Sequence, residues 1–276
     1  MLTASLILPL LMQVGPNPAL ALPPAVPEEL VEQRRLNRER QRPPLAIVES
    51  DPVQSCRARV AGNAEGVLLE AQARFDRAAG LDRAIAGHCL GLAQAELGRW
   101  PEAASAFRNA REALPSDQAA YGARLGLATA AAELAAGRPQ AALDELAQID
   151  PGSDRQLAGA IAIDRSRALV ALGRQDDAAE ALLQARTADP DNDEAWLLSA
   201  TLSRRMGQLD TALAQIERAA ILRPTGPEIG LEAGVIAALA GRDEAALRSW
   251  QSVLQSAPGT PAALTAAEYI AQVRGE

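Results

Sequence analysis

Two consecutive stretches of equal length decide the fold: residues 193–226 (DEAWLLSATLSRRMGQLDTALAQIERAAILRPTG) and residues 227–260 (PEIGLEAGVIAALAGRDEAALRSWQSVLQSAPGT). Aligned without gaps, they superpose a glycine on a glycine and a proline on a proline. The same 34-residue period extends back by one unit and joins six residues: Gly173, Gly207, Gly241, Pro190, Pro224 and Pro258. Two residue types that keep one period indicate an array of repeated supersecondary units.

Each unit has the pattern of two short helices joined by a glycine turn. In residues 193–226, apolar residues recur three and four positions apart on both sides of Gly207, as in amphipathic helices. Glycine suits the turn because it adopts positive φ at a helix C-terminus without a steric penalty. Pro224 ends the second helix, since its ring disfavours helix at the preceding residue and removes a hydrogen-bond donor. The sequence therefore predicts helical hairpins.

These units resemble the tetratricopeptide repeat, a helix-turn-helix of 34 residues. The family pattern combines apolar and small residues in the first helix with a glycine turn, alanines in the second helix and a closing proline. The last two units match it at Trp196, Ala200, Gly207, Ala212, Ile216, Ala219 and Pro224, and at Gly230, Gly234, Gly241, Ala246, Trp250, Val253 and Pro258. Two earlier units match it at Leu90, Gly91, Gly98, Ala103, Phe107, Ala110 and Pro115, and at Gly173, Ala178, Leu182, Ala185 and Pro190.

The resemblance implies an all-α fold, a right-handed superhelical solenoid of about five hairpins from about residue 81 to 259. End units of such arrays expose apolar faces that need covers, and we expect residues 63–79 and 261–273 to be the N-terminal and C-terminal covering helices. The solenoid is predicted over residues 61–276. The unit that hinges at Gly137 departs from the pattern because Pro151 arrives early, so the register of residues 123–151 stays open.

The first 60 residues are expected to lie outside the solenoid. Residues 2–14 are apolar and are followed by Ala19-Leu20-Ala21, so residues 1–21 have the pattern of a secretory signal peptide. A non-exported apolar tail and an uncleaved anchor are the alternatives. Residues 22–60 are rich in proline and charge and are expected to be a linker. We therefore expect a periplasmic or secreted protein, with a cytoplasmic location as the alternative.

The chain contains two cysteines, Cys56 and Cys89. In an exported protein this even count predicts a disulfide between them, whereas in the cytosol both would be inert thiols. His88 is the single histidine, and adjacent residues on a helix point in directions too different for a catalytic Cys–His pair. Three Cys and His residues are also too few for a structural zinc site. We expect no catalytic residue, no metal, no cofactor and no enzymatic activity.

The formal net charge of −8 limits the classes of partner. An acidic chain without a basic stripe is poorly suited to nucleic acid or to an anionic membrane surface. We therefore expect no nucleic-acid partner and no stable membrane insertion once the signal peptide has been removed.

The resemblance also implies that the first helices of successive hairpins line a concave groove that binds a protein or peptide. The positions expected to face the groove are Ile163, Arg167, Leu197, Thr201, Arg204, Leu231 and Val235. The lysines and asparagines with which some members of the family clamp a C-terminal carboxylate are absent. An apolar or amphipathic helical segment with acidic residues is thus the expected guest. The alternative is that these residues merely close the superhelix.

The expected function is a non-catalytic protein-interaction scaffold of the bacterial cell envelope that binds a peptide or a helical segment of its partner. Two alternatives stay open, because a fold by itself does not specify a function. One is a cytosolic or membrane-tethered adaptor of the same architecture. The other is a non-catalytic helper subunit of an enzyme complex.

Overall fold

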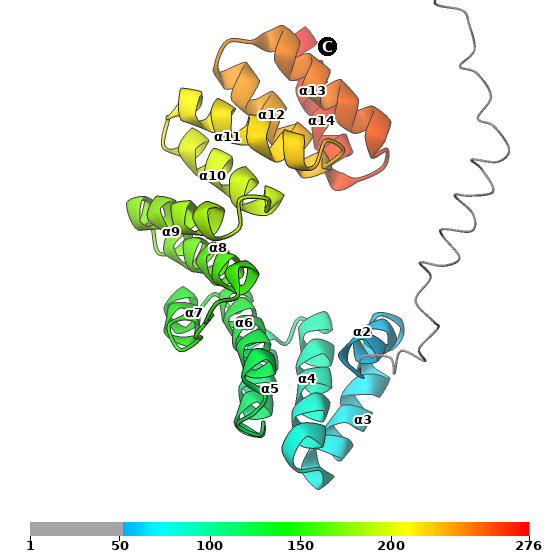
Figure 1. The fold of residues 1–276 in the computed structure, drawn as a ribbon. Helices are drawn as coiled ribbons and strands as arrows, with labels where there is room; N and C mark the ends of the chain where they lie inside the picture. Colours follow the sequence, from blue (N-terminus) through cyan, green and yellow to red (C-terminus); the bar gives the residue numbers. More distant parts are fainter. Residues whose placement is uncertain (1–51, 276) are drawn as a thin grey trace, which may run out of the picture. The chain divides into compact units, whose positions relative to one another are not determined.

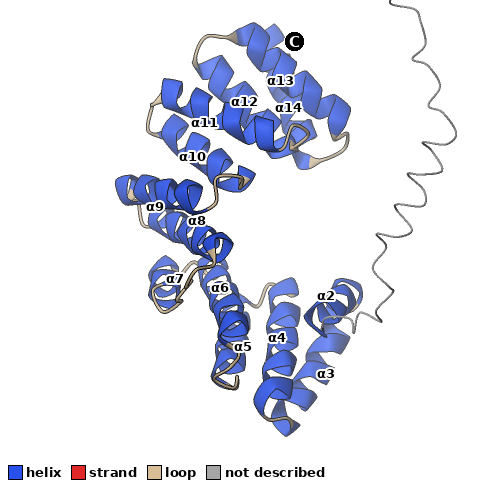
Figure 2. Cartoon of the chain, in the orientation of Figure 1, coloured by secondary structure: helices blue, strands red, loops and turns tan. Residues whose placement is uncertain are grey.

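The computed structural model describes residues 52–275, in which thirteen helices and no strand occur (Figures 1 and 2). The predicted signal peptide, residues 1–21, and residues 22–51 of the predicted linker lie outside the described residues. The described residues belong to one compact unit. Within this unit, each helix from α3 onwards packs mainly against the helices that precede and follow it along the chain, whereas α2 packs mainly against α4.

Five hairpins and two covering helices confirm the repeat prediction. The hairpins pair α4 (Gly80–Glu96) with α5 (Trp100–Glu112), α6 (Ala119–Ala135) with α7 (Pro139–Leu146), α8 (Arg155–Ala171) with α9 (Gln175–Ala188), α10 (Asp193–Arg205) with α11 (Leu209–Leu222), and α12 (Pro227–Leu239) with α13 (Asp243–Ser256). The covers are α3 (Ala64–Arg77) and α14 (Pro261–Arg274). The 34-residue lattice of glycines and prolines thus marks real turns and helix ends.

The hairpin turns follow one scheme, for which Gly207 serves as the example. Its φ of 76° is in the left-handed region, where a side chain would be strained. The amide of the next residue, Gln208, donates to the carbonyl of Ser203 over 2.8 Å. This backward hydrogen bond satisfies a carbonyl that the end of a helix leaves without a partner. The periodic glycine is therefore required by backbone geometry.

Small residues inside the first helices let the two helices of a hairpin approach closely. A Cβ added to Gly234 would collide with the indole of Trp250, which is 3% exposed. At Gly91 the corresponding neighbour is the Phe107 ring. One large ring from the second helix thus fills the space that a glycine in the first helix leaves open, in line with the close packing of protein interiors.

Helix α2 (Pro52–Gly62) lies inside the stretch that the sequence predicts as the end of the linker, so the described helices begin nine residues before the expected boundary at residue 61. The helix packs on α4 and α3. Its buried residues are Cys56 and Val60, one turn apart. Two apolar anchors in eleven residues give too weak a periodic pattern to predict a helix from sequence.

The early position of Pro151 predicts an irregular unit, and the irregular element of that unit is helix α7. It has 8 residues, whereas the other second helices have 13 or 14. Pro151 disfavours helix at Asp150, so the chain leaves the helical path early. Two buried carboxylates, Glu133 of α6 and Glu145 of α7, hold three arginines of α5 and of the α6–α7 turn at 2.6–2.9 Å: Arg108, Arg111 and Arg138.

A candidate site on the first helices

The first helices α8, α10 and α12 share a face on which consecutive hairpins are joined by ion pairs. Arg167 of α8 pairs with Glu194 of α10. Arg204 of α10 pairs with Glu232 of α12, with 2.6 Å between Nε and Oε1. We call the surface formed by α8, α10 and α12 on this side the first-helix face. It contains both arginines that the sequence assigns to a groove.

A pocket of about 200 Å³ opens on the first-helix face between α8 and α10. Its wall is mostly apolar, and two arginines, Arg167 and Arg205, stand among the lining residues. The remaining lining residues are Ser166, Val170, Leu182, Leu198, Thr201 and Leu202. Such a hollow can hold one aliphatic side chain of a bound segment and place a polar group beside an arginine.

The two arginines of the pocket differ in how their charge is used. Arg167 also bonds to Asp164 over 2.6 Å. Burial lowers the pKa of Arg167, but the bond to Asp164 and the charges of Asp164 and Glu194 outweigh it, so its pKa is raised. Arg205 is exposed and forms no hydrogen bond or ion pair with any of residues 52–275. Arg205 is thus the arginine with a charge free for a ligand.

The structure brings some of the predicted groove residues together and separates others. Arg167 and Thr201 line the pocket, whereas Leu197 packs against the cluster of α10, α11 and α12, and Arg204 pairs with Glu232 of α12. Leu231 and Val235 pack instead against the cluster of α12, α13 and α14. Each of these residues keeps part of its surface open to solvent. They form two neighbouring patches rather than one continuous site.

Ile163 is placed differently from the expectation. It is 3% exposed and packs against Ala185, Ala195 and Leu198, so its side chain belongs to the contact between hairpins. Its side chain points from α8 towards α10. Arg205, Val170 and Leu202, which line the pocket, have no distinctive residue type by which the sequence could identify them.

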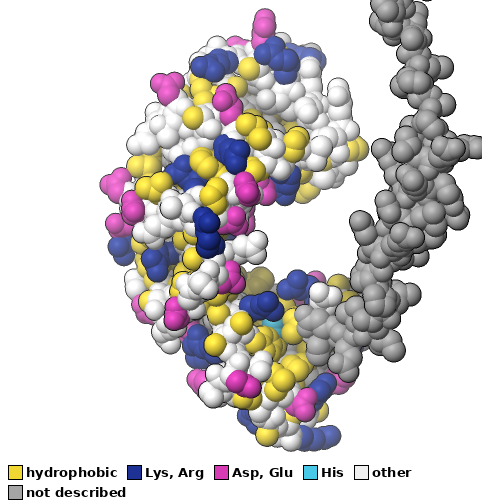
Figure 3. All heavy atoms as spheres, viewed as in Figure 1, with side chains coloured by type: hydrophobic (Ala, Val, Ile, Leu, Met, Phe, Trp, Pro, Cys, Tyr) yellow, Lys and Arg dark blue, Asp and Glu magenta, His cyan; other side chains and the backbone are white. Residues whose placement is uncertain are grey.

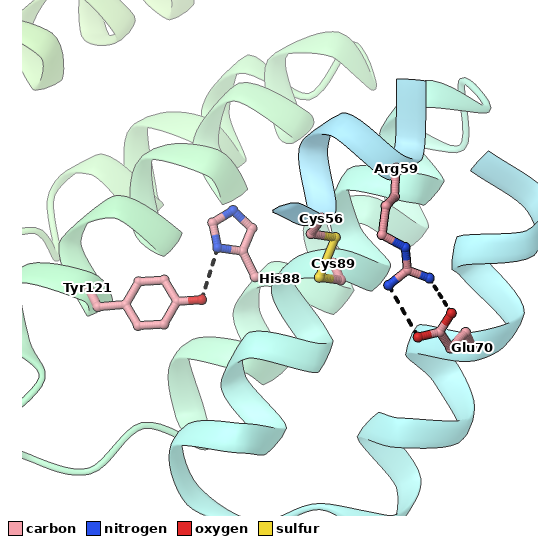
Figure 4. The surroundings of a disulfide bond; sticks show 6 residues. All are labelled: Cys56, Arg59, Glu70, His88, Cys89 and Tyr121. Atoms are coloured by element: carbon pink, nitrogen blue, oxygen red, sulfur yellow. Dashed lines mark hydrogen bonds and ion pairs between the residues drawn. A yellow bond between two sulfur atoms is a disulfide. The ribbon is translucent and has the colours of Figure 1, made fainter. Parts of the chain in front are cut away.

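The structure joins Cys56 and Cys89 in a disulfide that ties α2 to α4 (Figure 4). The two Cα atoms are 5.7 Å apart, a usual separation for bridged cysteines. The neighbouring His88 turns away from the bond: its Nδ1 lies 3.0 Å from the Tyr121 hydroxyl, and its ring meets Phe107 edge-on. Cys89 and His88 therefore do not form a nucleophile–base pair.

Within residues 52–275, no group of three or more His, Cys, Asp or Glu side chains is arranged to hold a metal ion. In the same part of the chain, no helix has both the length and the hydrophobicity to cross a membrane. The face drawn in Figure 3 carries basic and acidic side chains interspersed with apolar ones.

A profile of the tetratricopeptide repeat matches residues 163–227 and 197–261, which contain the pocket and the ion pairs of the first-helix face. Residues 163–261 are tetratricopeptide repeats (TPRs). The matched residues cover about half of α8 and all of α9 to α13, and α4 to α7 repeat the TPR hairpin in the geometry described above. The TPR array is thus longer than the part that the profile matches.

A solved structure supports the TPR fold. A thermophilic TPR protein from Thermus thermophilus superposes with a TM-score of 0.56 at 22% identity, over 70% of this chain and 100% of that one. Two further structures are similar at lower scores. MamA gives a TM-score of 0.49 at 16% identity, over 60% of this chain and 94% of MamA. YrrB, described as a TPR protein with an unusual peptide-binding site, gives a TM-score of 0.46 at 19% identity, over 74% of this chain and 99% of YrrB. No curated protein matches this TPR chain.

Proposed function

We propose that this protein is a non-catalytic scaffold of the bacterial cell envelope that binds a peptide or helical segment of a partner protein on its first-helix face. The observation that carries the proposal is the pocket between α8 and α10, which combines an apolar wall with the uncommitted charge of Arg205. An exposed apolar hollow beside an unpaired charge is a feature of binding surfaces.

The chemistry of the pocket defines the expected guest. Val170, Leu198 and Leu202 favour an aliphatic side chain, and Arg205 favours a carboxylate close to it. Arg204 is less suited to the ligand, since its side chain is 23% exposed and held by Glu232. The proposed partner segment therefore presents a leucine-like residue and, about one helical turn away, an aspartate or glutamate.

The cell-envelope setting is supported by the disulfide of Cys56 and Cys89. Disulfides form and persist in oxidising compartments and are rare in the cytosol. The apolar run of residues 2–14, with the pattern of a signal peptide, points the same way. N-terminal sequencing of the mature protein from envelope material tests this part, because a chain that still begins at Met1 in the cytosol would contradict it.

The binding site is tested by photo-crosslinking from Thr201, which lines the pocket, in intact cells. The cross-linked partner is then purified and its affinity measured for the wild type and for Arg205→Glu. Charge reversal beside an acidic ligand should weaken binding at least tenfold, equal to about 1.4 kcal/mol. Arg77→Glu is the matched control, since Arg77 is also exposed and in the last turn of its helix. Equal affinities for both variants and the wild type would refute the site.

A further inference from the structure

The contact between α10 and α12 repeats the contact between α8 and α10 one 34-residue period later. We call the α8–α10 contact the first seam and the α10–α12 contact the second seam. The pocket of the first seam has Leu182 and Leu202 at its floor, which are 2% and 4% exposed. The residues 34 positions later, Ile216 and Ile236, are also buried and belong to one apolar cluster. Both seams therefore have an apolar floor.

The walls of the two seams differ in chemistry. In the first seam, Val170 and Leu198 line the open pocket of about 200 Å³. Their counterparts 34 residues later are Arg204 and Glu232. Arg204 Nε donates to Glu232 Oε1 over 2.6 Å, and Arg204 Nη2 donates to Glu232 Oε2 over 3.3 Å. The two side chains are only 23% and 14% exposed. In the second seam, a largely buried ion pair thus stands at the positions that leave the first seam hollow.

The rims of the two seams differ in the opposite sense. Arg167 and Arg205 line the pocket of the first seam. The residues 34 positions later are Thr201 and Leu239, and Leu239 is 57% exposed. The first seam therefore surrounds an apolar hollow with positive charge, whereas the second seam combines an internal ion pair with uncharged residues at its rim.

The ion pair of the second seam resists displacement by an apolar side chain. Its two parallel hydrogen bonds join a guanidinium to a carboxylate, an arrangement that is both strong and directional. A leucine that entered between Arg204 and Glu232 would leave two largely buried charges without partners. Breaking a buried ion pair in this way costs more free energy than the burial of one leucine contributes. The second seam is therefore closed to such a side chain.

We propose that the Arg204–Glu232 ion pair determines the specificity of the first-helix face by closing the second seam to large apolar side chains. The partner segment then carries one aliphatic anchor, for the first seam, and a small residue where it crosses the second seam. This inference rests on the proposed function and specifies the residue pattern of the partner. Neighbouring helices pack about 8–10 Å apart, and a helix rises 1.5 Å per residue. In a helical partner, the small residue is therefore about seven positions, or two turns, from the anchor.

Three fluorescein-labelled, hydrocarbon-stapled helices are the probes for this proposal. Stapling removes the cost of forming a short helix in water. Each probe carries a leucine anchor and, one turn away, a glutamate. The reference probe has alanine at the other positions of this face. The two-leucine probes carry a second leucine about two turns before the anchor in one case and about two turns after it in the other. Fluorescence anisotropy should show that all three bind the wild-type full chain with affinities within about twofold of each other.

Removing the ion pair should open the second seam. Arg204→Ala/Glu232→Ala deletes both charges, so neither is left buried without a partner, and it uncovers the floor at Ile216 and Ile236. One of the two-leucine probes should then bind at least about tenfold more tightly than the reference probe, because its second leucine becomes buried. The matched control is Arg248→Ala/Glu244→Ala, which deletes an exposed ion pair of α13. In this control, all three probes should bind as they bind the wild type.

The reverse exchange gives an independent variant. Val170→Arg/Leu198→Glu places the ion pair in the first seam and should weaken binding of the reference probe at least about tenfold. Circular dichroism of each variant confirms that the helices are intact.

The outcomes separate this inference from the proposed function. The inference is overturned if a two-leucine probe binds the wild type about tenfold more tightly than the reference probe does. It is also overturned if Arg204→Ala/Glu232→Ala creates no preference for a second leucine, or if Val170→Arg/Leu198→Glu leaves binding unchanged. A reference probe that does not bind the wild type, or that binds Arg205→Glu equally well, would refute the proposed function and this inference with it.

Discussion

Arg167 illustrates how single residues of the first-helix face combine structural and electrostatic roles. Its guanidinium lies between Asp164 on the same helix and Glu194 on the next hairpin. Burial raises the pKa of Asp164, whereas the hydrogen bond and the charge of Arg167 lower it. Burial has the larger effect, so the pKa of Asp164 is raised. The ionised form of Asp164 is thus less favourable in the folded chain than in the unfolded one.

This shift predicts a dependence of stability on pH. The folded state binds the Asp164 proton more tightly than the unfolded state does, so protonated Asp164 stabilises the fold. This stabilisation is fully present below the unfolded pKa and is lost as the pH rises through the raised folded pKa. Asp164→Asn cannot ionise. Its stability relative to the wild type should therefore increase as the pH rises from about 3.8, the ordinary value of the carboxyl, and then level off. Urea unfolding at a series of pH values measures this difference.

The control is Asp177→Asn, at an exposed carboxylate paired with Arg174 on the outside of α9. It reports how any lost negative charge changes the pH profile of this acidic chain. If both variants follow the same profile, or if the advantage of Asp164→Asn falls with increasing pH, burial does not dominate the ionisation of Asp164.

At the scale of elements, α2 depends on one covalent bond more than on packing. The helix buries Cys56 and Val60, and the pair of Arg59 with Glu70 is exposed on both sides. In the chain-entropy description, a disulfide closing a loop of 33 residues stabilises by about 3–4 kcal/mol. The disulfide therefore contributes much of the free energy that holds α2 against α4.

Reduction should consequently release α2 and leave the rest of the array folded. Hydrogen exchange of the reduced protein should show faster amide exchange over residues 52–62, with α8 to α13 unchanged. The variant Cys56→Ala/Cys89→Ala should show the same exchange pattern with and without reductant. Uniformly faster exchange along the whole array would contradict this localised role of the disulfide.

Sequence predicts the elements where the backbone itself requires a residue type, and it fails where contacts between elements decide. Gly207 and Pro224 identify a turn and a helix end, so the hairpins could be predicted residue by residue. Arg204 could be assigned to the right face, but not its pairing with Glu232, which depends on the angle between α10 and α12. The availability of Arg205 for a ligand likewise follows from the position of its neighbours in space.

At the scale of the molecule, stability in a repeat array is the sum of each hairpin and its contacts with its neighbours. The hairpins around α7 are joined differently from the others, because buried carboxylates and arginines supplement the shortened helix. Glu145, with a side chain 7% exposed, holds Arg108 and Arg111 together. Removing one member of such a buried group leaves charges without partners.

The C-terminal end of the array tests the same nearest-neighbour description. Helix α14 covers the last hairpin through Ala263, Ala266 and Ile270, and its Tyr269 ring lies 5.3 Å from the Trp250 ring. A chain ending at Gly259 loses these contacts. Burial of each large apolar side chain contributes about 1.5–3 kcal/mol, so we expect α12 and α13 to lose about 3 kcal/mol or more of local stability.

Hydrogen exchange and tryptophan emission measure this loss separately. Exchange should accelerate in α12 and α13 but not in α4 to α9, because those hairpins have no contact with α14. The emission should shift to longer wavelength as Trp250, 3% exposed in the complete array, meets water. Leu264→Ala changes a residue of α14 that is 63% exposed, so it should change stability by no more than about 0.5 kcal/mol. Cooperative unfolding of all hairpins in the shortened chain would mean that coupling between repeats extends well beyond nearest neighbours.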